Sequence, residues 1–293
     1  MSPEGRRTDP YGVLKEEAST PMKTENAFER PVRITDGIYW VGTFDPDTEL
    51  HCNPYLVKGE KSVALIDSGS RPDFAGVMMK ILQAGIHPGE ITALIYQHFD
   101  PDLCGSLPNF LDLCTNPDLR IYSKSGNNVF IKHYVEKSFH SRFVNIQEGE
   151  TILLGDRQLK FIGTPYAHAA ESFITFDEQT RTLFTSDIFG SFRREWDMFL
   201  DLDEKCFDCS DYANCPNGKP ESDCPFPSII SFHKSVMPSS RALRVALNRI
   251  LKVDATLIAP QHGSILRSPR VIAHVIRVLK ALEEVGIDGI PEE

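Results

Sequence analysis

The stretch that decides the fold is residues 91–107, which read ITALIYQHFDPDLCGSL. It begins with an apolar run at residues 91–96, which has the length and composition of a buried strand. Polar side chains then follow at alternate positions, namely His98, Asp100 and Asp102. Alternate residues of an extended segment point the same way, so these three are expected to converge. Pro101 keeps Asp100 extended and argues against a helix here. The pattern is typical of a metal site at the end of a strand.

Similar loops recur three times downstream. His168 ends the loop TPYAH after the apolar run 159–162, and Asp187 follows the run 183–185. His262 lies in the loop PQHG after the run 255–258. A single loop of this kind is also explained as a solvated turn formed by Asp and Pro. Four loops, each with a His or Asp just past a strand-like run, favour one shared site.

The order of these motifs resembles the metallo-β-lactamase superfamily. They stand here as QHFDPDLCGS, TPYAHAAES, FTSD and APQHGS, and the resemblance covers about residues 32–276. Two positions depart from the zinc hydrolases, because Asp100 replaces the middle histidine and Leu103 replaces the last one. A carboxylate at the first of these positions is similar to the diiron branch, the flavodiiron proteins. Residues 51–56, HCNPYL, also resemble the stand-alone oxygen-binding diiron proteins. The resemblance implies an α/β fold, a four-layer αββα sandwich.

The resemblance also implies a set of six ligands. His98, Asp100 and His168 would hold one metal, Asp102 and His262 the other, and Asp187 would bridge them. Asp67, which follows the strand-like run 63–66, would support the ligand loop from behind. Leu103 leaves the second metal with one imidazole fewer and gives it an apolar neighbour.

The composition of the ligand set favours iron. Three imidazoles and three carboxylates suit non-haem iron better than a histidine-rich zinc site, although zinc and manganese remain alternatives. Three carboxylates leave two ferrous ions with a formal charge of +1 (+4 − 3). The implied function is binding or reduction of O2 or NO, by a sensor, a carrier or a small reductase. The alternatives are a zinc hydrolase of a thioester, lactone or phosphodiester, and a fold retained only for binding. Tyr166 and His51 are candidates to hydrogen-bond a bound oxygen species, but core packing is favoured for both.

Composition narrows the function classes further. The chain has 293 residues and a formal net charge of −10, without a Lys/Arg cluster. This argues against nucleic acid as a partner, and no apolar stretch approaches the length of a membrane span. We expect a mobile N-terminal arm at residues 1–31 without a signal peptide, then one domain at residues 32–293. The protein is expected to be cytoplasmic and to have no flavin site. An external electron donor or a signalling protein is expected as its partner. A homodimer is one expected assembly.

The seven cysteines fall into two groups. Cys52, Cys104 and Cys114 stand among apolar residues and are interpreted as small buried hydrophobes. The other four form the pattern CxxC-x5-C-x8-C within a Cys-rich insertion at about residues 201–227, and they are Cys206, Cys209, Cys215 and Cys224. In a reducing compartment such thiols favour a zinc or iron–sulfur centre over disulfides. Unliganded or regulatory thiols are the alternative.

The sequence also predicts five helical segments. A helix is expected at residues 74–84, one at 105–113 and one at 125–134. Residues 229–251 are expected to be mostly helical with a bend at Pro238, and an amphipathic helix at residues 271–282 should end the domain.

Overall fold

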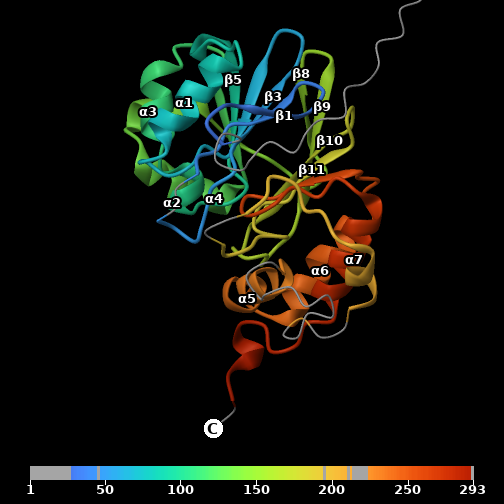
Figure 1. Cartoon of the computed structure of the whole chain (residues 1–293). Helices are drawn as coiled ribbons and strands as arrows, with labels where there is room; N and C mark the ends of the chain where they lie inside the picture. Colours follow the sequence, from blue (N-terminus) through green and yellow to red (C-terminus); the bar gives the residue numbers. More distant parts are fainter. Residues whose placement is uncertain (1–27, 45–46, 194–195, 210–211, 213–223, 292–293) are drawn as a thin grey trace, which may run out of the picture.

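The structure is a computed structural model that describes residues 28–44, 47–193, 196–209, 212 and 224–291. It contains two sheets, shown face to face in Figure 1. The first has seven strands in chain order, β1 (Val32–Thr35), β2 (Ile38–Trp40), β3 (Tyr55–Lys58), β4 (Val63–Ile66), β5 (Ile91–Ile95), β6 (Arg120–Ser123) and β7 (Phe143–Asn145). The second has five, in the order β12 (Leu257–Ala259), β11 (Thr182–Phe184), β10 (Phe173–Asp177), β9 (Arg157–Gly163) and β8 (Thr151–Leu154).

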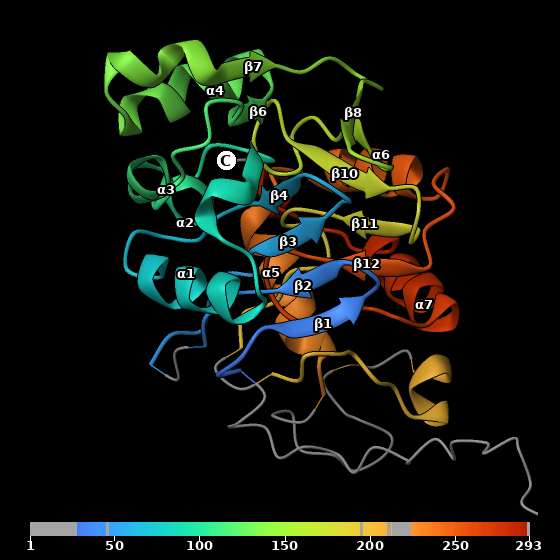
Figure 2. The ribbon, with the colours of Figure 1, turned by 90° about the horizontal axis from the view of Figure 1, so that it is seen from above.

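Helices cover the outer face of each sheet. Figure 2 shows α1 (Phe74–Gln83), α2 (Pro101–Cys104), α3 (Leu107–Leu113) and α4 (Ser125–Ile131) on the side of the first sheet. The second sheet is covered by α5 (Phe226–Val236), α6 (Ser240–Ile250) and α7 (Pro269–Lys280). Short 3-10 helices lie at Pro88–Glu90, Lys132–Tyr134, Lys137–Arg142, Glu204–Asp208 and Ile287–Gly289.

Three apolar clusters hold these layers together. The middle cluster lies between the sheets and joins Trp40, Tyr55 and Ile66 of the first sheet to Phe161 and Phe184 of the second. A second cluster packs the first sheet against α1 and α3, and a third packs the second sheet against α5, α6 and α7. Each sheet therefore buries both faces, which is why β4 is buried at every position. The predicted four-layer αββα sandwich is confirmed.

The strand directions bring four loops together. β4 and β5 are parallel, so their carboxyl ends lie at one edge of the first sheet. In the second sheet β11 and β12 are parallel, and β9 runs the same way because both β9 and β11 are antiparallel to β10. The loops after β5, β9, β11 and β12 are the loops in which the sequence predicts the ligands.

Local expectations are mostly confirmed, with corrections at two prolines. Pro101 does not exclude a helix, because Asp100 stays extended (φ −69°, ψ 150°) while Pro101 begins α2. Proline restricts the residue before it, but it fits the first turn of a helix, where its missing N–H is not needed. The expected single helix at residues 229–251 is two helices, because Met237 is extended and Ser239 caps α6 by accepting a hydrogen bond from the Ala242 N–H.

Other boundaries differ by smaller amounts. The helix expected at residues 105–113 is divided into α2 and α3, and the one at 125–134 is α4 followed by a 3-10 turn. Residues 1–27 of the predicted N-terminal arm lie outside the described residues, whereas Phe28 is buried against Trp40 and Trp196. Within the part of the chain that the structure describes, no helix is both long and apolar enough to cross a membrane.

Candidate metal centre

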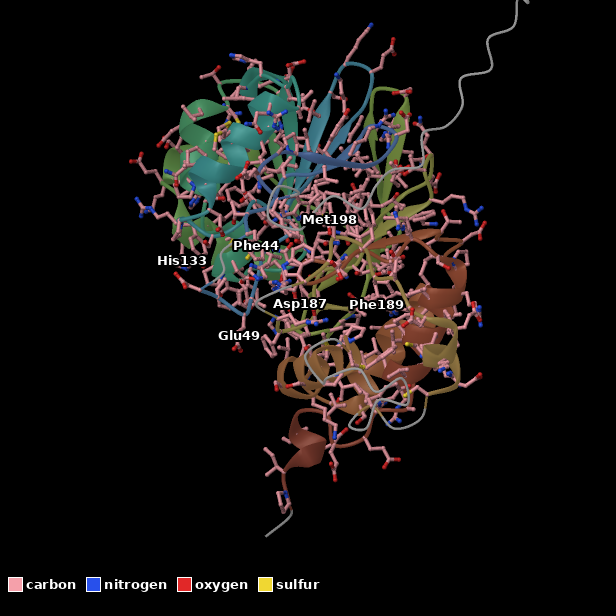
Figure 3. The ribbon with its side chains drawn as sticks, viewed as in Figure 1. Phe44, Glu49, His133, Asp187, Phe189 and Met198 are labelled. Carbon is pink, nitrogen blue, oxygen red and sulfur yellow. The ribbon has the colours of Figure 1, made fainter. Side chains whose placement is uncertain are left out.

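The six residues predicted as ligands lie together at the carboxyl ends of the strands. Three come from the loop after β5, and the others follow β9, β11 and β12. Figure 3 labels Asp187, which lies in the interior between the half of the ribbon that holds the first sheet and the half that holds α5, α6 and α7. Because they come from both sheets, these side chains meet only when the two halves pack together.

The first group consists of His98, Asp100 and His168, whose ligand atoms lie within 4.8 Å of one another. The Asp100 carboxylate is 3.2 Å from His168 Nε2 and 3.7 Å from His98 Nε2. His98 is buried, while the side chains of Asp100 and His168 are 31% and 25% exposed. One side of this group is therefore open to a small molecule.

The second group consists of Asp102, His262 and Cys52, again with all ligand atoms within 4.8 Å. His262 Nε2 lies 3.3 Å from the Asp102 carboxylate. Asp102 reaches this group because it lies in α2, whereas an extended loop would have aimed it at the same spot as Asp100. Cys52 is buried, as the sequence predicts, but its sulfur faces the polar group. The sequence analysis interpreted Cys52 as a small buried hydrophobe and did not identify it as a candidate ligand.

Asp187 lies between the two groups. One carboxylate oxygen, Oδ2, is 3.0 Å from His168 Nε2, and the other, Oδ1, is 3.9 Å from His98 Nε2 and 3.7 Å from His262 Nε2. The residue is only 3% exposed, and Oδ1 has no hydrogen-bond partner among the described residues. A buried polar oxygen without a partner is costly unless something binds it. The donor set and this oxygen fit a pair of metal ions.

Neighbouring residues orient the imidazoles. His98 Nδ1 is hydrogen-bonded to Ser186 Oγ at 2.9 Å, and His262 Nδ1 donates to the His51 carbonyl oxygen at 2.9 Å. Both rings therefore present Nε2 to the carboxylates, as metal-binding histidines do when the other nitrogen is held. Ser186 was missed by the sequence reasoning, although it directly precedes Asp187 in the motif FTSD.

Asp67 supports the ligand loop through a hydrogen bond to the backbone of that loop. Its carboxylate accepts a hydrogen bond from the Gln97 N–H at 3.2 Å, next to His98. The Gln97 side chain in turn donates to the Phe184 carbonyl at 2.9 Å and accepts from the Ser186 N–H at 3.1 Å. Asp67 thus stiffens the backbone that positions His98 and joins it to the strand that precedes Asp187.

The electrostatics of the groups follow from burial and pairing. Burial opposes the charged form of every one of these side chains. It raises the pKa of Asp67 to about 8, against the effect of His98. For His168 burial is overcome by Asp100 and Asp187, which raise its pKa to about 10. The same pairing holds the pKa values of Asp100 and Asp187 below their usual range despite their burial. The carboxylates of Asp100 and Asp187 therefore stay ionised, as metal ligands must.

Four further residues are not members of the two ligand groups. Tyr166 is 59% exposed, so the favoured role in core packing is wrong for it. His51 is buried and stacks on Phe44 with ring centroids 4.9 Å apart, which agrees with packing. Leu103 packs in the apolar cluster under α1 and α3. His133, labelled in Figure 3, is exposed.

The cysteine cluster is described only in part. Cys206 and Cys209 are partly buried at the 3-10 helix Glu204–Asp208, and Cys224 is buried next to the start of α5. Cys215 lies outside the described residues.

Several known proteins are similar to this chain in sequence or in fold. Type A flavoprotein fprA of Rhodobacter capsulatus is 29% identical over 266 residues, which is 86% of this chain and 56% of that protein. Rubredoxin oxygen:oxidoreductase of Desulfovibrio gigas matches with a TM-score of 0.71 at 21% identity, over 87% of this chain and 62% of that one. The apo state of the chemotaxis sensor ODP from T. denticola matches with a TM-score of 0.66 at 23% identity, over 86% of this chain and 93% of that one.

The chain spans a little over half the length of the flavoprotein it matches. A family model described as ODP family beta lactamase matches residues 50–263, which include every residue of the two ligand groups and Asp187. This match covers well over half of the chain, and the fold agrees with it. The chain belongs to the ODP family of beta-lactamase-fold proteins.

Proposed function

We propose that this protein holds two iron ions and binds or reduces O2 or NO. The observation that carries the proposal is the pairing of two ligand groups around one buried carboxylate, Asp187. His98, Asp100 and His168 would hold one metal, and Asp102 and His262 the other. A ferrous pair, when bound, supplies electrons to a diatomic ligand. Carboxylate and imidazole donors suit iron in this role, with manganese and zinc as the competing metals.

The residues of the chain prepare the site in three ways. Ser186 and the His51 carbonyl fix the ring orientations of His98 and His262, so that little reorganisation accompanies metal binding. The ionised carboxylates balance most of the charge of two divalent ions. The partial exposure of Asp100 and His168 leaves an approach for a small ligand on the side of the first group.

Two versions of the function differ in their need for electrons. A sensor or carrier needs only reversible binding, and one matched structure bears the name of a chemotaxis sensor. A reductase needs an outside donor, and another matched structure is named as a rubredoxin oxygen:oxidoreductase. An external electron donor or a signalling protein is therefore the proposed partner, in the cytoplasm, and a homodimer is the assembly we propose.

Metal analysis and gas titration test the function. Protein purified without air should contain about two irons at the main site, and its absorption spectrum should change when O2 or NO is added. Full reversal under vacuum supports a carrier or sensor, and consumption of O2 with an added reductant supports a reductase. Stoichiometric zinc, no response to either gas after iron reconstitution, and hydrolysis of thioesters, lactones or phosphodiesters would replace this proposal by the zinc hydrolase.

The cysteine cluster is proposed to hold a separate zinc or iron–sulfur centre. The spacing of Cys206, Cys209, Cys215 and Cys224 supports this, together with the turn in which the Cys209 N–H donates to the Cys206 carbonyl. Replacing Cys206 and Cys209 by Ser should remove visible absorption and donor-driven O2 consumption if the centre is an iron–sulfur relay. It should remove one zinc and lower the melting temperature if the centre is a structural zinc. Unchanged metal content, spectrum and stability would leave the thiols unliganded.

A further inference from the structure

Cys52 is held in a fixed position beside the second ligand group. Its sulfur lies within 4.8 Å of the ligand atoms of Asp102 and His262, and the residue is 7% exposed. No strand or helix contains it, so other contacts must hold it in place. The neighbouring residues on both sides supply them, and each connects this segment to the loop that carries His262.

Asn53 supplies most of these connections. Its backbone N–H donates to the Gln261 carbonyl at 2.8 Å, and its side-chain amide donates to the carbonyls of Pro260 and Gly263 at 3.1 and 2.8 Å. Trp40 Nε1 donates to Asn53 Oδ1 at 2.8 Å, so the amide is anchored from both sides. On the other side of Cys52, the His51 carbonyl accepts from His262 Nδ1. The thiol and the imidazole are thus fixed relative to each other.

The second group needs another ligand. Without Cys52 it offers Asp102, His262 and a share of Asp187, which is fewer than the four donors of a tetrahedral site. Leu103, which takes the place of an imidazole in zinc hydrolases, turns its side chain into the apolar cluster. The unpartnered Oδ1 of Asp187 lies 3.7 Å from His262 Nε2 at the edge of this group.

We propose that the Cys52 thiolate is a ligand of the second metal, in the place that Leu103 leaves empty. This inference rests on the metal centre proposed above. On binding, the thiol proton passes to solvent buffer and a metal–sulfur bond forms, without any change of oxidation state. The formal charge of two divalent ions with three carboxylates and one thiolate is then zero (+4 − 4). A sulfur donor also favours iron or zinc over manganese at this position, because manganese prefers oxygen ligands.

Cobalt spectroscopy tests the ligand directly. Metal-free wild type, Cys52→Ser and Cys114→Ser are titrated with Co²⁺, and the spectra are subtracted at equal cobalt content. Cys114 is the matched control, because it is also buried but packs among apolar residues near α3. The difference spectrum of wild type minus Cys52→Ser should show a sulfur-to-cobalt charge-transfer band, whereas the difference spectrum of wild type minus Cys114→Ser should show none. The remaining cysteines are common to all three proteins, so their bands cancel.

The affinity provides a second readout. In Cys52→Ser, loss of a ligand should lower the affinity of the second metal site for Co²⁺ at least ~10-fold, since even outer contacts of a metal site change the affinity by that factor. Cys114→Ser should bind as the wild type does. A wild type minus Cys52→Ser spectrum without a charge-transfer band, together with an unchanged affinity for Co²⁺, would show that Cys52 is only a buried core residue.

A measurement on the wild type covers the case in which Cys52→Ser does not fold. In ¹¹³Cd-substituted protein, coupling between the metal and the Hβ protons of Cys52 is expected. A loaded second site without this coupling overturns the inference, whatever the gas response of the iron protein. Sulfur ligation in an iron protein that responds to neither O2 nor NO would instead overturn the proposed function and leave the ligand assignment intact.

Discussion

At the scale of single residues, one carboxylate faces ligands from both sheets. Asp187 Oδ2 lies 3.0 Å from Nε2 of His168, which follows a strand of the second sheet, and Oδ1 lies 3.9 Å from Nε2 of His98, which follows β5 of the first sheet. A residue placed in this way is positioned to donate to both of the proposed metal sites, and no neighbouring ligand could replace it in both. Asp67, by contrast, contacts the backbone N–H of Gln97 and acts on the ligands only through the loop.

Replacement of these two residues should therefore have unequal effects. Asp187→Ala is expected to lose most of one metal or both, because it removes a donor from each. Asp67→Ala should weaken metal binding by about 10–100-fold, as outer contacts of a metal site do. Elemental analysis after dialysis measures both, with Asp254→Ala as the control, because the Asp254 side chain is 86% exposed in a surface ion pair. Full metal content in Asp187→Ala would refute its role as the bridge.

A buried histidine behind the site predicts a pH effect. His233 Nδ1 donates to the Ile229 carbonyl at 2.7 Å, and Nε2 accepts from the Phe189 N–H at 3.0 Å. Burial lowers the pKa of His233 to about 4. The unfolded chain therefore takes up a proton on His233 between about pH 6.5 and 4, where the folded protein does not.

The free energy of unfolding should accordingly fall as the pH drops from about 6.5 to 4. His233→Gln lacks this titration, so the wild type should lose stability faster, by up to ~1.4 kcal/mol per pH unit. Urea denaturation of the two metal-free proteins at several pH values measures the difference, in which the common titration of the ligand histidines cancels. Parallel pH profiles would mean that the folded protein protonates His233 over the same pH range as the unfolded chain does.

At the scale of elements, the Arg157 side chain of β9 links the two sheets by an ion pair on one side and a hydrogen bond on the other. Arg157 Nη1 donates to the Asp177 carboxylate of β10 at 2.9 Å, and Nη2 donates to the Asp36 carbonyl in the β1–β2 turn at 2.9 Å. Both side chains are almost fully buried, at 3% and 0% exposure. Gly37 completes the turn with φ +65°, and a side chain there would collide with the Arg157 guanidinium. Arg157 thus connects the β1–β2 hairpin of the first sheet to the second sheet.

Breaking this pair should cost far more than breaking an exposed one. Arg157→Met leaves the Asp177 carboxylate buried without its cation, and a loss of about 3–5 kcal/mol in the free energy of unfolding is expected. Arg181→Met is the matched control, because Arg181 pairs with Asp254 at the surface and should cost only about 0–1 kcal/mol. Urea denaturation measures both. Equal costs would show that the buried pair adds no more than a surface contact.

At the scale of the whole molecule, the ligands connect the two sheets. Asp100, Asp102 and His98 follow β5 of the first sheet, and the other ligand histidines and Asp187 follow strands of the second. Metal held by these residues, as proposed above, would therefore stabilise the packing of the halves, because it binds the folded state and not the unfolded chain.

Removal of metal should lower the stability of the entire domain. A ligand at about 1,000 times its Kd contributes about 4 kcal/mol to the folded state, so treatment with a chelator should reduce the melting temperature by several degrees. Calorimetry before and after chelation measures this shift, and restoration by added Fe²⁺ is the control for irreversible damage. An unchanged melting temperature in protein shown to be metal-free would mean that the groups do not couple the sheets.

The sequence, through its resemblance to a known superfamily, predicted the layers of the fold, which the structure confirms, and a set of six candidate ligands, which the structure brings together. Apolar runs that end in His98, His168, Asp187 or His262 are local signals, and their order along the chain is specific to one superfamily. Such patterns indicate which residues follow a strand. They contain no information about which side chain faces which across the two sheets.

Tertiary structure decided the rest. Only the fold turns Asp102 into α2 and toward His262, although Pro101 suggested an extended loop. Only the fold brings Cys52 and Arg157 to partners far along the chain, at His262 and at Asp36. A cysteine among apolar neighbours is a core residue or a ligand according to what packs against it. That depends on contacts between distant segments, which no local pattern records.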